Sequence, residues 1–238
     1  MTFNRLHRRI AAKTARYGEA PAIIVAFGNS VTQGYTRAGT IEPKAVYHQQ
    51  LKEKLEAHYP LCTFSVINAG AAAQTATDAL ARLERDVIRY QPDLVIISFG
   101  LNDAVAFDEG GSAFKRSLTT IVERVKVETD ADIILLTPNF MVSADNPFID
   151  STERHYLSNF LEVYKAGCLG QVAQIIRDCA EAFQLPLADV YAAWQRLVAN
   201  GEDTNAMLAN GLNHPNAAAH TLCADLIIDL IHGQGQGL

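Results

Sequence analysis

Five short apolar runs, separated by longer stretches with helical periodicity, constrain the fold of this chain more than any other feature. The runs cover about residues 21–28, 62–68, 94–99, 133–137 and 185–190. Runs that are rich in β-branched residues and do not alternate with polar ones are typical of strands buried on both faces of a parallel sheet. We therefore predict an α/β fold: a three-layer α/β/α sandwich around a mainly parallel five-stranded sheet.

The stretches between these runs have apolar residues three and four positions apart, as in amphipathic helices. Helices are predicted at about residues 5–17, 43–58, 76–90, 112–127, 156–183, 191–199 and 216–231. The segments 139–152 and 201–213 are expected to be irregular, and the Gly/Gln-rich end, 233–238, to be disordered. The sequence contains no linker and no internal repeat, which indicates one domain over residues 1–238 with an N-terminal helix within 1–20.

Composition excludes several classes of protein. The chain has 238 residues, 49% of them hydrophobic, which is enough for one sizeable core. A formal net charge of −6 argues against nucleic acid as a partner, and the apolar runs are too short to span a membrane. Residues 1–10 are basic but lack the apolar segment of a secretory signal, and the four cysteines form no CxxC pair, as in proteins of a reducing compartment. We therefore expect a cytoplasmic protein with a small neutral substrate.

Polar loops follow the strands at the edge where ligands of open α/β sheets bind. The first run leads into FGNSVTQG, residues 27–34, which presents Ser30 directly after a strand. The third run is followed by GLND with Asn102, and the last helix is preceded by NGLNHPN with His214. Each of these loops alone is also typical of an ordinary turn or helix cap. Right-handed crossovers bring them all to one edge, which favours a shared chemical role.

Acyl transfer would account for all of these loops. Ser30 would be the nucleophile and His214 its base. The tetrahedral oxyanion needs hydrogen-bond donors, which the backbone N–H of Ser30, an N–H of the small-residue loop 70–73 and the side-chain amide of Asn102 would supply.

On these residues the chain resembles the SGNH hydrolases, also called the GDSL esterase/lipase family, over about residues 21–231. The first block of that family is similar to GNSVTQG, the third is present as GLND, and the last is similar to HPN at 214–216. The resemblance implies a flavodoxin-like strand order and ester hydrolysis without a cofactor. It also implies Ser30 as nucleophile, His214 as base and Asn102 as oxyanion donor.

The chain departs from the family pattern at three positions. Asn29 replaces the usual Asp, which we expect to alter the turn only slightly. The oxyanion glycine of the second block falls at Ala73, whose N–H can serve if its φ is negative; otherwise Gly70 becomes the candidate. The Asp that the family has three residues before the histidine is here Gly211, so the resemblance supplies no acid for a Ser-His-Asp triad.

His214 therefore needs another partner. The start of the final helix disfavours imidazolium and should keep the base neutral. A substitute acceptor for its Nδ1–H would be a backbone carbonyl in 208–211, the Asn210 side chain or Asp203. A carbonyl or Asn210 is favoured, because Asp203 is more distant in the sequence.

The substrate is constrained only by analogy. A short-chain acyl ester, possibly acetyl, on a carbohydrate is the first hypothesis, and a lysophospholipid or thioester is the second. Phe140, Met141, Phe148 and Tyr156 are candidates for lining an acyl or sugar pocket, although packing within their loop is the simpler interpretation. The alternative function is a catalytically weak or degenerate domain that binds a carbohydrate or acts as a scaffold. Nucleotide, flavin and metal sites are disfavoured, because no GxGxxG, GxxxxGK[ST] or HExxH motif is present.

Overall fold

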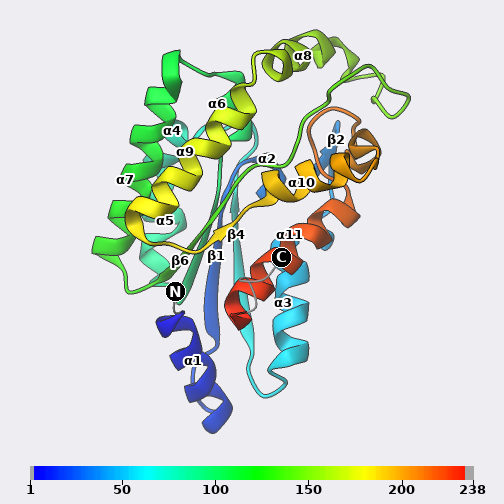
Figure 1. Ribbon diagram of the computed structural model, residues 1–238. Coiled ribbons are helices and arrows are strands. Elements are labelled where there is room, and N and C mark those ends of the chain that lie inside the picture. Colours follow the sequence, from blue (N-terminus) through cyan, green and yellow to red (C-terminus); the bar gives the residue numbers. More distant parts are fainter. Residues whose placement is uncertain (1–2, 234–238) are drawn as a thin grey trace.

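At the centre of the computed structural model, which describes residues 3–233, is a sheet of five parallel strands in the order β4-β1-β5-β6-β7 (Figure 1). The strands are β1 Ala22–Gly28, β4 Phe64–Gly70, β5 Leu94–Ser98, β6 Asp132–Leu136 and β7 Leu187–Ala188. This arrangement confirms the predicted sandwich and the flavodoxin-like order. Residues 234–238 of the predicted disordered tail lie outside the described residues.

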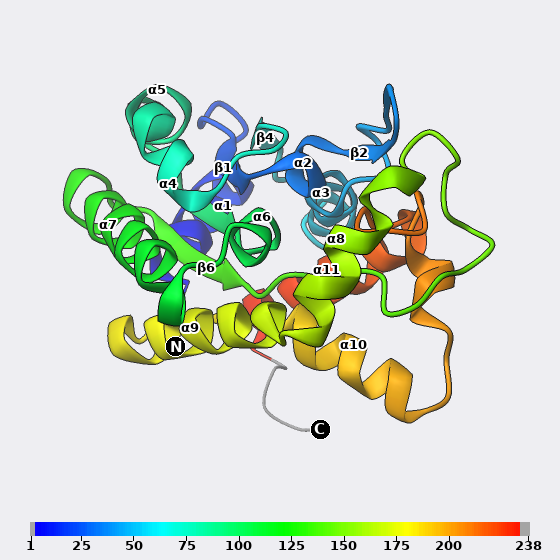
Figure 2. The same ribbon diagram turned by 90° about the horizontal axis from the view of Figure 1, so that it is seen from above.

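Helices cover both faces of the sheet, which is why its central strands β1, β5 and β6 consist mostly of buried apolar residues (Figure 2). One layer consists of α4 Ala76–Ala79, α5 Leu83–Asp86, α7 Ser112–Glu128 and α9 Cys168–Phe183. The other consists of α1 Asn4–Ala15, α3 Tyr47–His58, α10 Val190–Ala199 and α11 Ala217–His232. Successive residues of β1 serve opposite layers: Val25 and Phe27 belong to the first core, and Ile24 and Ala26 to the second.

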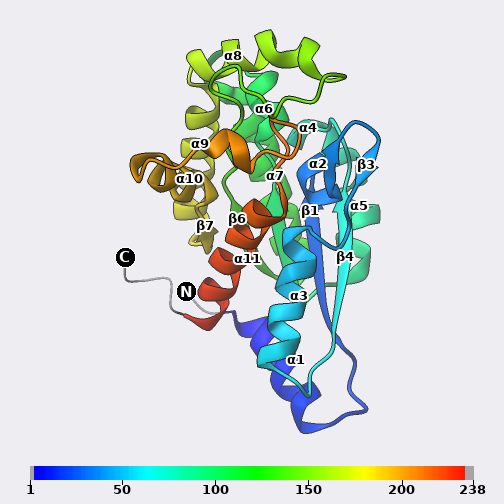
Figure 3. The same cartoon turned by 90° about the vertical axis from the view of Figure 1, so that its right-hand side faces the viewer.

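The two ends of the sheet have different roles. Helix α1 closes the amino-terminal end, where the Leu6 N–H donates to Asp132 at 2.8 Å and Arg5 pairs with Asp93 at 2.9 Å. The loops that follow the strands gather at the opposite end, beneath α8 Leu157–Lys165 (Figure 3). Between residues 3 and 233, no helix combines the length and apolar character that crossing a membrane requires.

Two predicted helices are interrupted. The segment 76–90 consists of α4, η1 Leu80–Arg82, α5 and η2 Ile88–Tyr90. The prediction of one helix over 156–183 is wrong, because η4 Arg154–Tyr156 and α8 precede α9. Gly167 interrupts the helix between α8 and α9 with a left-handed φ of 67°.

The remaining short elements were not predicted, and most of them lie at the carboxyl edge of the sheet. They are α2 Ser30–Gln33, the hairpin of β2 Tyr35–Arg37 and β3 Thr40–Ile41, α6 Leu101–Val105, η3 Glu109–Gly111 and η5 Thr204–Met207. These elements have two to five residues, which is too short for a periodic hydrophobic pattern to reveal them.

Candidate active site

Ser30 is the first residue of helix α2, which begins directly after β1. The side chain of Asn29 caps this helix by accepting the Val31 N–H at 3.0 Å, so the amide does what a carboxylate would do in this turn. Gly28 is required before it, because a Cβ at this position would meet the Ser98 carbonyl oxygen at 2.6 Å. The turn thus holds Ser30 at the end of the strand. The backbone N–H of Ser30 lies in the first turn of α2 and has no hydrogen-bond partner within residues 3–233.

His214 lies against this serine. Its Nε2 is 3.1 Å from Ser30 Oγ, although 184 residues separate the two in the sequence. Burial lowers the pKa of His214 to about 4, and a hydrogen bond to the backbone of Thr36 offsets part of this effect. The imidazole is therefore neutral near pH 7, as a general base must be. Burial is the largest cause of this neutrality, rather than the helix start that the sequence suggested; α11 begins only at Ala217.

Asn102 lies in α6 and borders the same pocket as Ser30 and His214. Its Nδ2 donates one hydrogen to the Gln74 carbonyl at 2.9 Å, which fixes the amide and leaves its second hydrogen available. The neighbouring Asp103 is buried and accepts the N–H groups of Ala76 and Gly100 at 2.8 and 2.9 Å. Asp103 therefore ties the second and third loops of the edge together.

Ala73 borders the pocket but has a φ of +60°, in the left-handed region. The sequence made its role conditional on a negative φ and named Gly70 as the alternative. Gly70, however, is the last residue of β4 and donates its N–H to Asn68 Oδ1 at 2.9 Å. The Ala73 N–H has no hydrogen-bond partner in the described part of the chain. At Ala73 the backbone therefore has the left-handed conformation that glycine adopts without strain.

The side-chain amide of Asn210 contacts the His214 ring through its nitrogen atom, not through its oxygen. Asn210 Oδ1 accepts the backbone N–H groups of Leu212, Asn213 and His214 at distances of 3.1, 3.0 and 3.1 Å. These three donors fix the orientation of the amide, so that its Nδ2 faces His214 Nδ1 at 3.1 Å. The contact suggested by the sequence is present, but an amide nitrogen cannot accept the Nδ1–H.

Asp203, the other side chain considered as a partner of His214, lies at the start of η5. Its carboxylate accepts the Asn205 N–H at 2.9 Å and caps η5. Asp203 is exposed, and no hydrogen bond within residues 3–233 joins it to His214.

The pocket in front of Ser30 has a volume of about 420 Å³. Small, aromatic and polar side chains from five segments line it: Ser30, Tyr35, Ala72, Ala73, Asn102, Val105, Glu153, Tyr156, Asn159, Phe160, Leu212, Asn213 and His214. Of the four apolar residues singled out in 139–160, only Tyr156 borders this pocket. Phe140 and Met141 line a different cavity beside α10, and Phe148 lies near the β2–β3 hairpin.

Tyr35 and Glu153 are pocket residues that the sequence did not single out. The Tyr35 ring lies 5.0 Å from the His214 ring, and Glu153 accepts a hydrogen bond from Asn210. A two-strand hairpin and a single 3₁₀ turn deliver these residues. Neither element has a sequence signal strong enough to place it beside the edge loops.

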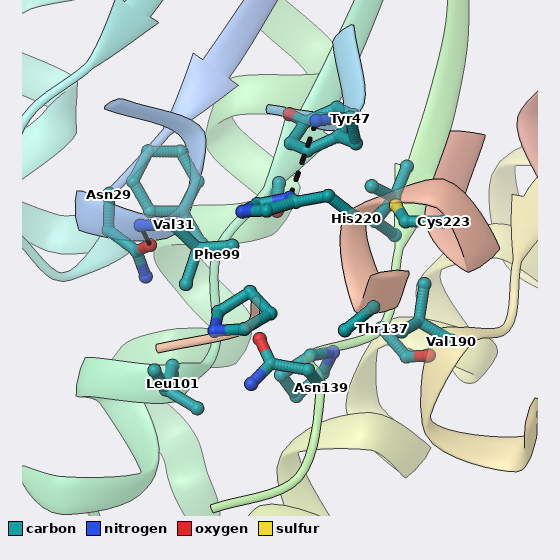
Figure 4. A pocket seen from close by; sticks show the side chains of 15 residues that line it. Asn29, Val31, Tyr47, Phe99, Leu101, Thr137, Asn139, Val190, His220 and Cys223 are labelled. Atoms are coloured by element: carbon teal, nitrogen blue, oxygen red, sulfur yellow. Dashed lines mark hydrogen bonds between the residues drawn. The ribbon is translucent and has the colours of Figure 1, made fainter. Parts of the chain in front are cut away.

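A second group of polar side chains lies behind the Ser30 turn, and two of them, Tyr47 and His220, help to line a cavity of about 30 Å³ (Figure 4). There His220 Nδ1 accepts the Tyr47 N–H at 3.3 Å, and the Tyr47 hydroxyl lies 3.1 Å from Thr32 Oγ1. His48 Nε2 is 2.9 Å from the Thr32 carbonyl. Burial lowers the pKa of His48 to about 4 and that of His220 to about 3, so this layer is uncharged at neutral pH.

Residues 26–222 match the GDSL-like lipase/acylhydrolase family. The acetylxylan esterase of Geobacillus stearothermophilus is 27% identical over 183 residues, which cover 71% of this chain and 73% of that protein. The uncharacterized lipoprotein YqeF of Bacillus subtilis is 24% identical over 208 residues, covering 81% and 80% of the two chains.

Solved structures share the fold. The acetylxylan esterase from Geobacillus stearothermophilus superposes with a TM-score of 0.66 at 23% identity, covering 88% of this chain and 94% of that one. A two-domain esterase active on acetylated mannans gives a TM-score of 0.70 at 22% identity and covers 99% of this chain, which spans 55% of that larger protein.

The α/β/α sandwich with polar loops gathered at the carboxyl edge of its sheet is therefore an SGNH hydrolase fold. The chain belongs to the GDSL-like lipase/acylhydrolase family and is a carboxylic ester hydrolase. The resemblance drawn from the sequence blocks is confirmed.

Proposed function

We propose that this protein is a serine esterase that removes short acyl groups, acetyl above all, from carbohydrate esters through an acyl-enzyme. The observation that carries the proposal is the 3.1 Å contact between Ser30 Oγ and His214 Nε2 inside a pocket that Asn102 also borders. A hydroxyl beside a neutral imidazole is the arrangement that nucleophilic catalysis requires.

In the first half of the reaction, Ser30 Oγ attacks the ester carbonyl carbon and its proton passes to His214 Nε2. The negative charge that develops on the carbonyl oxygen would be bound by the Ser30 N–H, the free hydrogen of Asn102 Nδ2 and the Ala73 N–H. The bond to the sugar oxygen then breaks, and that oxygen leaves with the proton from His214. In the second half, water attacks the acyl-enzyme and gives a proton to His214. The bond to Ser30 Oγ then breaks, His214 returns the proton to Ser30 Oγ, and the acid is released.

Two features support a small acyl group on a sugar. The pocket beside Ser30 is walled by the small side chains of Ala72 and Ala73, and the rings of Tyr35 and Tyr156 border it as apolar faces with polar tips. The acetylxylan esterase relative and the esterase active on acetylated mannans act on acetylated polysaccharides.

A chain-length series tests the proposal. Hydrolysis of p-nitrophenyl acetate, butyrate and octanoate and of acetylated xylo- and manno-oligosaccharides is measured, with Ser30→Ala as the control for background activity. We expect kcat/KM to be highest for acetyl esters and to fall at least tenfold toward octanoate. A preference for octanoate would contradict the substrate class. Carbohydrate binding without any hydrolysis would favour the alternative of a degenerate binding domain.

A further inference from the structure

Gly211 stands where the family has the Asp of the triad, and the structure leaves no room for a side chain at this position. Gly211 has a left-handed φ of 68°, and a Cβ there would meet the Phe148 carbonyl carbon at 2.5 Å. The segment that occupies this space is bonded in place: the Asp150 N–H donates to the Asn210 carbonyl at 3.0 Å, and the Asn146 side chain donates to the Gly211 carbonyl at 3.2 Å. An Asp at position 211 is therefore incompatible with the packing of residues 146–150.

The same segment delivers a carboxylate from another direction. Glu153 follows it in the sequence, borders the Ser30 pocket and accepts a hydrogen bond from Asn210 Nδ2 at 2.6 Å. That Nδ2 atom also lies 3.1 Å from His214 Nδ1, so the Glu153 oxygen and the ring nitrogen are at most about 6 Å apart.

The Asn210 amide, which lies between Glu153 and His214, has fewer hydrogens to donate than acceptor atoms around it. Asn210 Nδ2 carries two hydrogens and faces three acceptor atoms: Glu153 Oε2 at 2.6 Å, Asn213 Oδ1 at 3.0 Å and His214 Nδ1 at 3.1 Å. The two shortest contacts are those to oxygen. When these oxygens take both hydrogens, His214 Nδ1 is not held as an acceptor. The Glu153–Asn210 bond therefore weakens the hydrogen bond that would hold the opposite tautomer, whose Nε2 carries a hydrogen and cannot take the Ser30 proton.

We propose, on the basis of the proposed esterase function, that Glu153 is the positioning residue that replaces the missing triad Asp and acts on His214 through Asn210. When His214 takes the Ser30 proton, its ring becomes positive, and the Glu153 carboxylate is the negative charge that stabilises it. In the triad, the acid orients the histidine and stabilises the same imidazolium by direct contact. Here an intervening amide separates the charges, so the effect is smaller.

The other groups that face His214 do not supply this charge. They are the Ser30 hydroxyl at 3.1 Å, the Tyr35 ring at 5.0 Å and the backbone of Thr36. His220, a titratable group of the buried layer that interacts electrostatically with His214, is neutral at pH 7, because burial lowers its pKa to about 3. Among the described residues, Glu153 is thus the carboxylate with a hydrogen-bonded path to the ring.

The direct test is Glu153→Gln, which keeps an oxygen for Asn210 but removes the charge. We expect kcat on p-nitrophenyl acetate to fall about 10- to 100-fold with KM little changed. We also expect the acid limb of the kcat/KM profile to move to lower pH, because imidazolium has lost a counter-charge. Glu162→Gln, an exposed carboxylate on α8, is the matched control and should change neither quantity.

A second variant separates electrostatics from structure. Asn210→Asp in the Glu153→Gln background puts a carboxylate in direct reach of His214 Nδ1, while one of its oxygens keeps the three backbone N–H groups. We expect this double variant to recover most of the lost kcat. A loss of activity in Glu153→Gln with an unmoved acid limb and no recovery would show a merely structural role and overturn the proposal.

An NMR titration of the His214 ring makes the test independent of turnover. In the Ser30→Ala background, His214 should titrate at lower pH when Glu153 is Gln than when it is Glu. Equal titration curves would overturn the role of Glu153 even if the esterase function holds. Absence of esterase activity in the wild type, with the shift present, would instead contradict the proposed function and leave the electrostatic coupling standing.

Discussion

The guanidinium of Arg82 donates a hydrogen bond of 2.7 Å to the carbonyl oxygen of Gly28, at the point where β1 turns into the helix of the candidate nucleophile. The same buried side chain donates to the Ala69 carbonyl at 2.7 Å and to Gln74 Oε1 at 2.5 Å, and it stacks over the Phe27 ring. One cation thus joins two strand ends to the loop that carries Ala73 and Gln74. The candidate oxyanion site is built on this junction.

Replacement of Arg82 by Met should lower the free energy of unfolding by about 3–5 kcal/mol, since it strips partners from buried carbonyl groups and from Asp86. Chemical denaturation measures the loss. Arg85→Met is the matched control: its side chain is 68% exposed and also pairs with Asp86, so its removal should cost far less stability than the removal of Arg82. Equal losses in the two variants would show that the buried junction is not a source of stability.

Ala73→Gly should stabilise the protein by up to about 1 kcal/mol, because the residue has a left-handed φ of +60° that glycine adopts without strain. Activity should be retained, because the backbone N–H is unchanged. Ala72→Gly is the neighbouring control without a positive φ, and it should destabilise instead. Thermal denaturation of the three proteins decides the point, and a destabilised Ala73→Gly would contradict the assignment of strain to this position.

Asn102→Ala should reduce kcat about 10²- to 10³-fold if its amide binds the oxyanion. Asn102→Asp keeps the shape but has no hydrogens to donate, and it should be equally inactive while circular dichroism stays that of the wild type. Steady-state kinetics on p-nitrophenyl acetate measures the effect. An active Asn102→Asp enzyme would remove this side chain from the oxyanion site.

The protein should lose stability as the pH falls from about 6.5 to 4. Burial lowers the pKa of His48 and His214 to about 4 and that of His220 to about 3, below the ordinary 6.5. In this window the unfolded chain binds more protons than the folded one, so each histidine contributes a slope of up to about 1.4 kcal/mol per pH unit, with its full stabilisation present above pH 6.5. Burial raises the pKa of Asp103 to about 6, which acts in the opposite direction between pH 6 and 4 and offsets part of the loss.

Urea denaturation at several pH values measures this slope. The His214→Gln substitution should reduce this slope by the contribution of roughly one proton. His155 is an exposed residue of η4, and its substitution by Gln should leave the slope unchanged. A His214→Gln variant with the wild-type slope would contradict the buried neutral state of this histidine.

The sheet could be predicted from sequence because its central strands β1, β5 and β6 consist mostly of buried apolar residues. The order of motifs along the chain indicated the edge on which the candidate site lies. Ser30, Asn102 and His214, all predicted, border one pocket. The interruption of the helix 156–183 at Gly167 was missed, because apolar positions on α8 and α9 keep a helical spacing on both sides of the break.

The surroundings of His214 depend on tertiary contacts that no local pattern encodes. Whether Asn210 meets the ring with oxygen or nitrogen follows from three backbone N–H groups of its own loop. The approach of Glu153 follows from the close packing of residues 148–149 on Gly211, visible in sequence only as an absent side chain. The cytoplasmic location expected from the cysteines stays a prediction.

The central claim is that Ser30 carries the acyl group, and trapping the intermediate tests it most directly. The protein is mixed with p-nitrophenyl acetate, quenched in acid within the first turnovers, and analysed by peptide mass spectrometry. The account predicts one added acetyl group on the peptide that contains Ser30, and none in Ser30→Ala. An unmodified Ser30 peptide in a protein that turns over the ester, or an acetyl group carried by another residue during turnover, would contradict it.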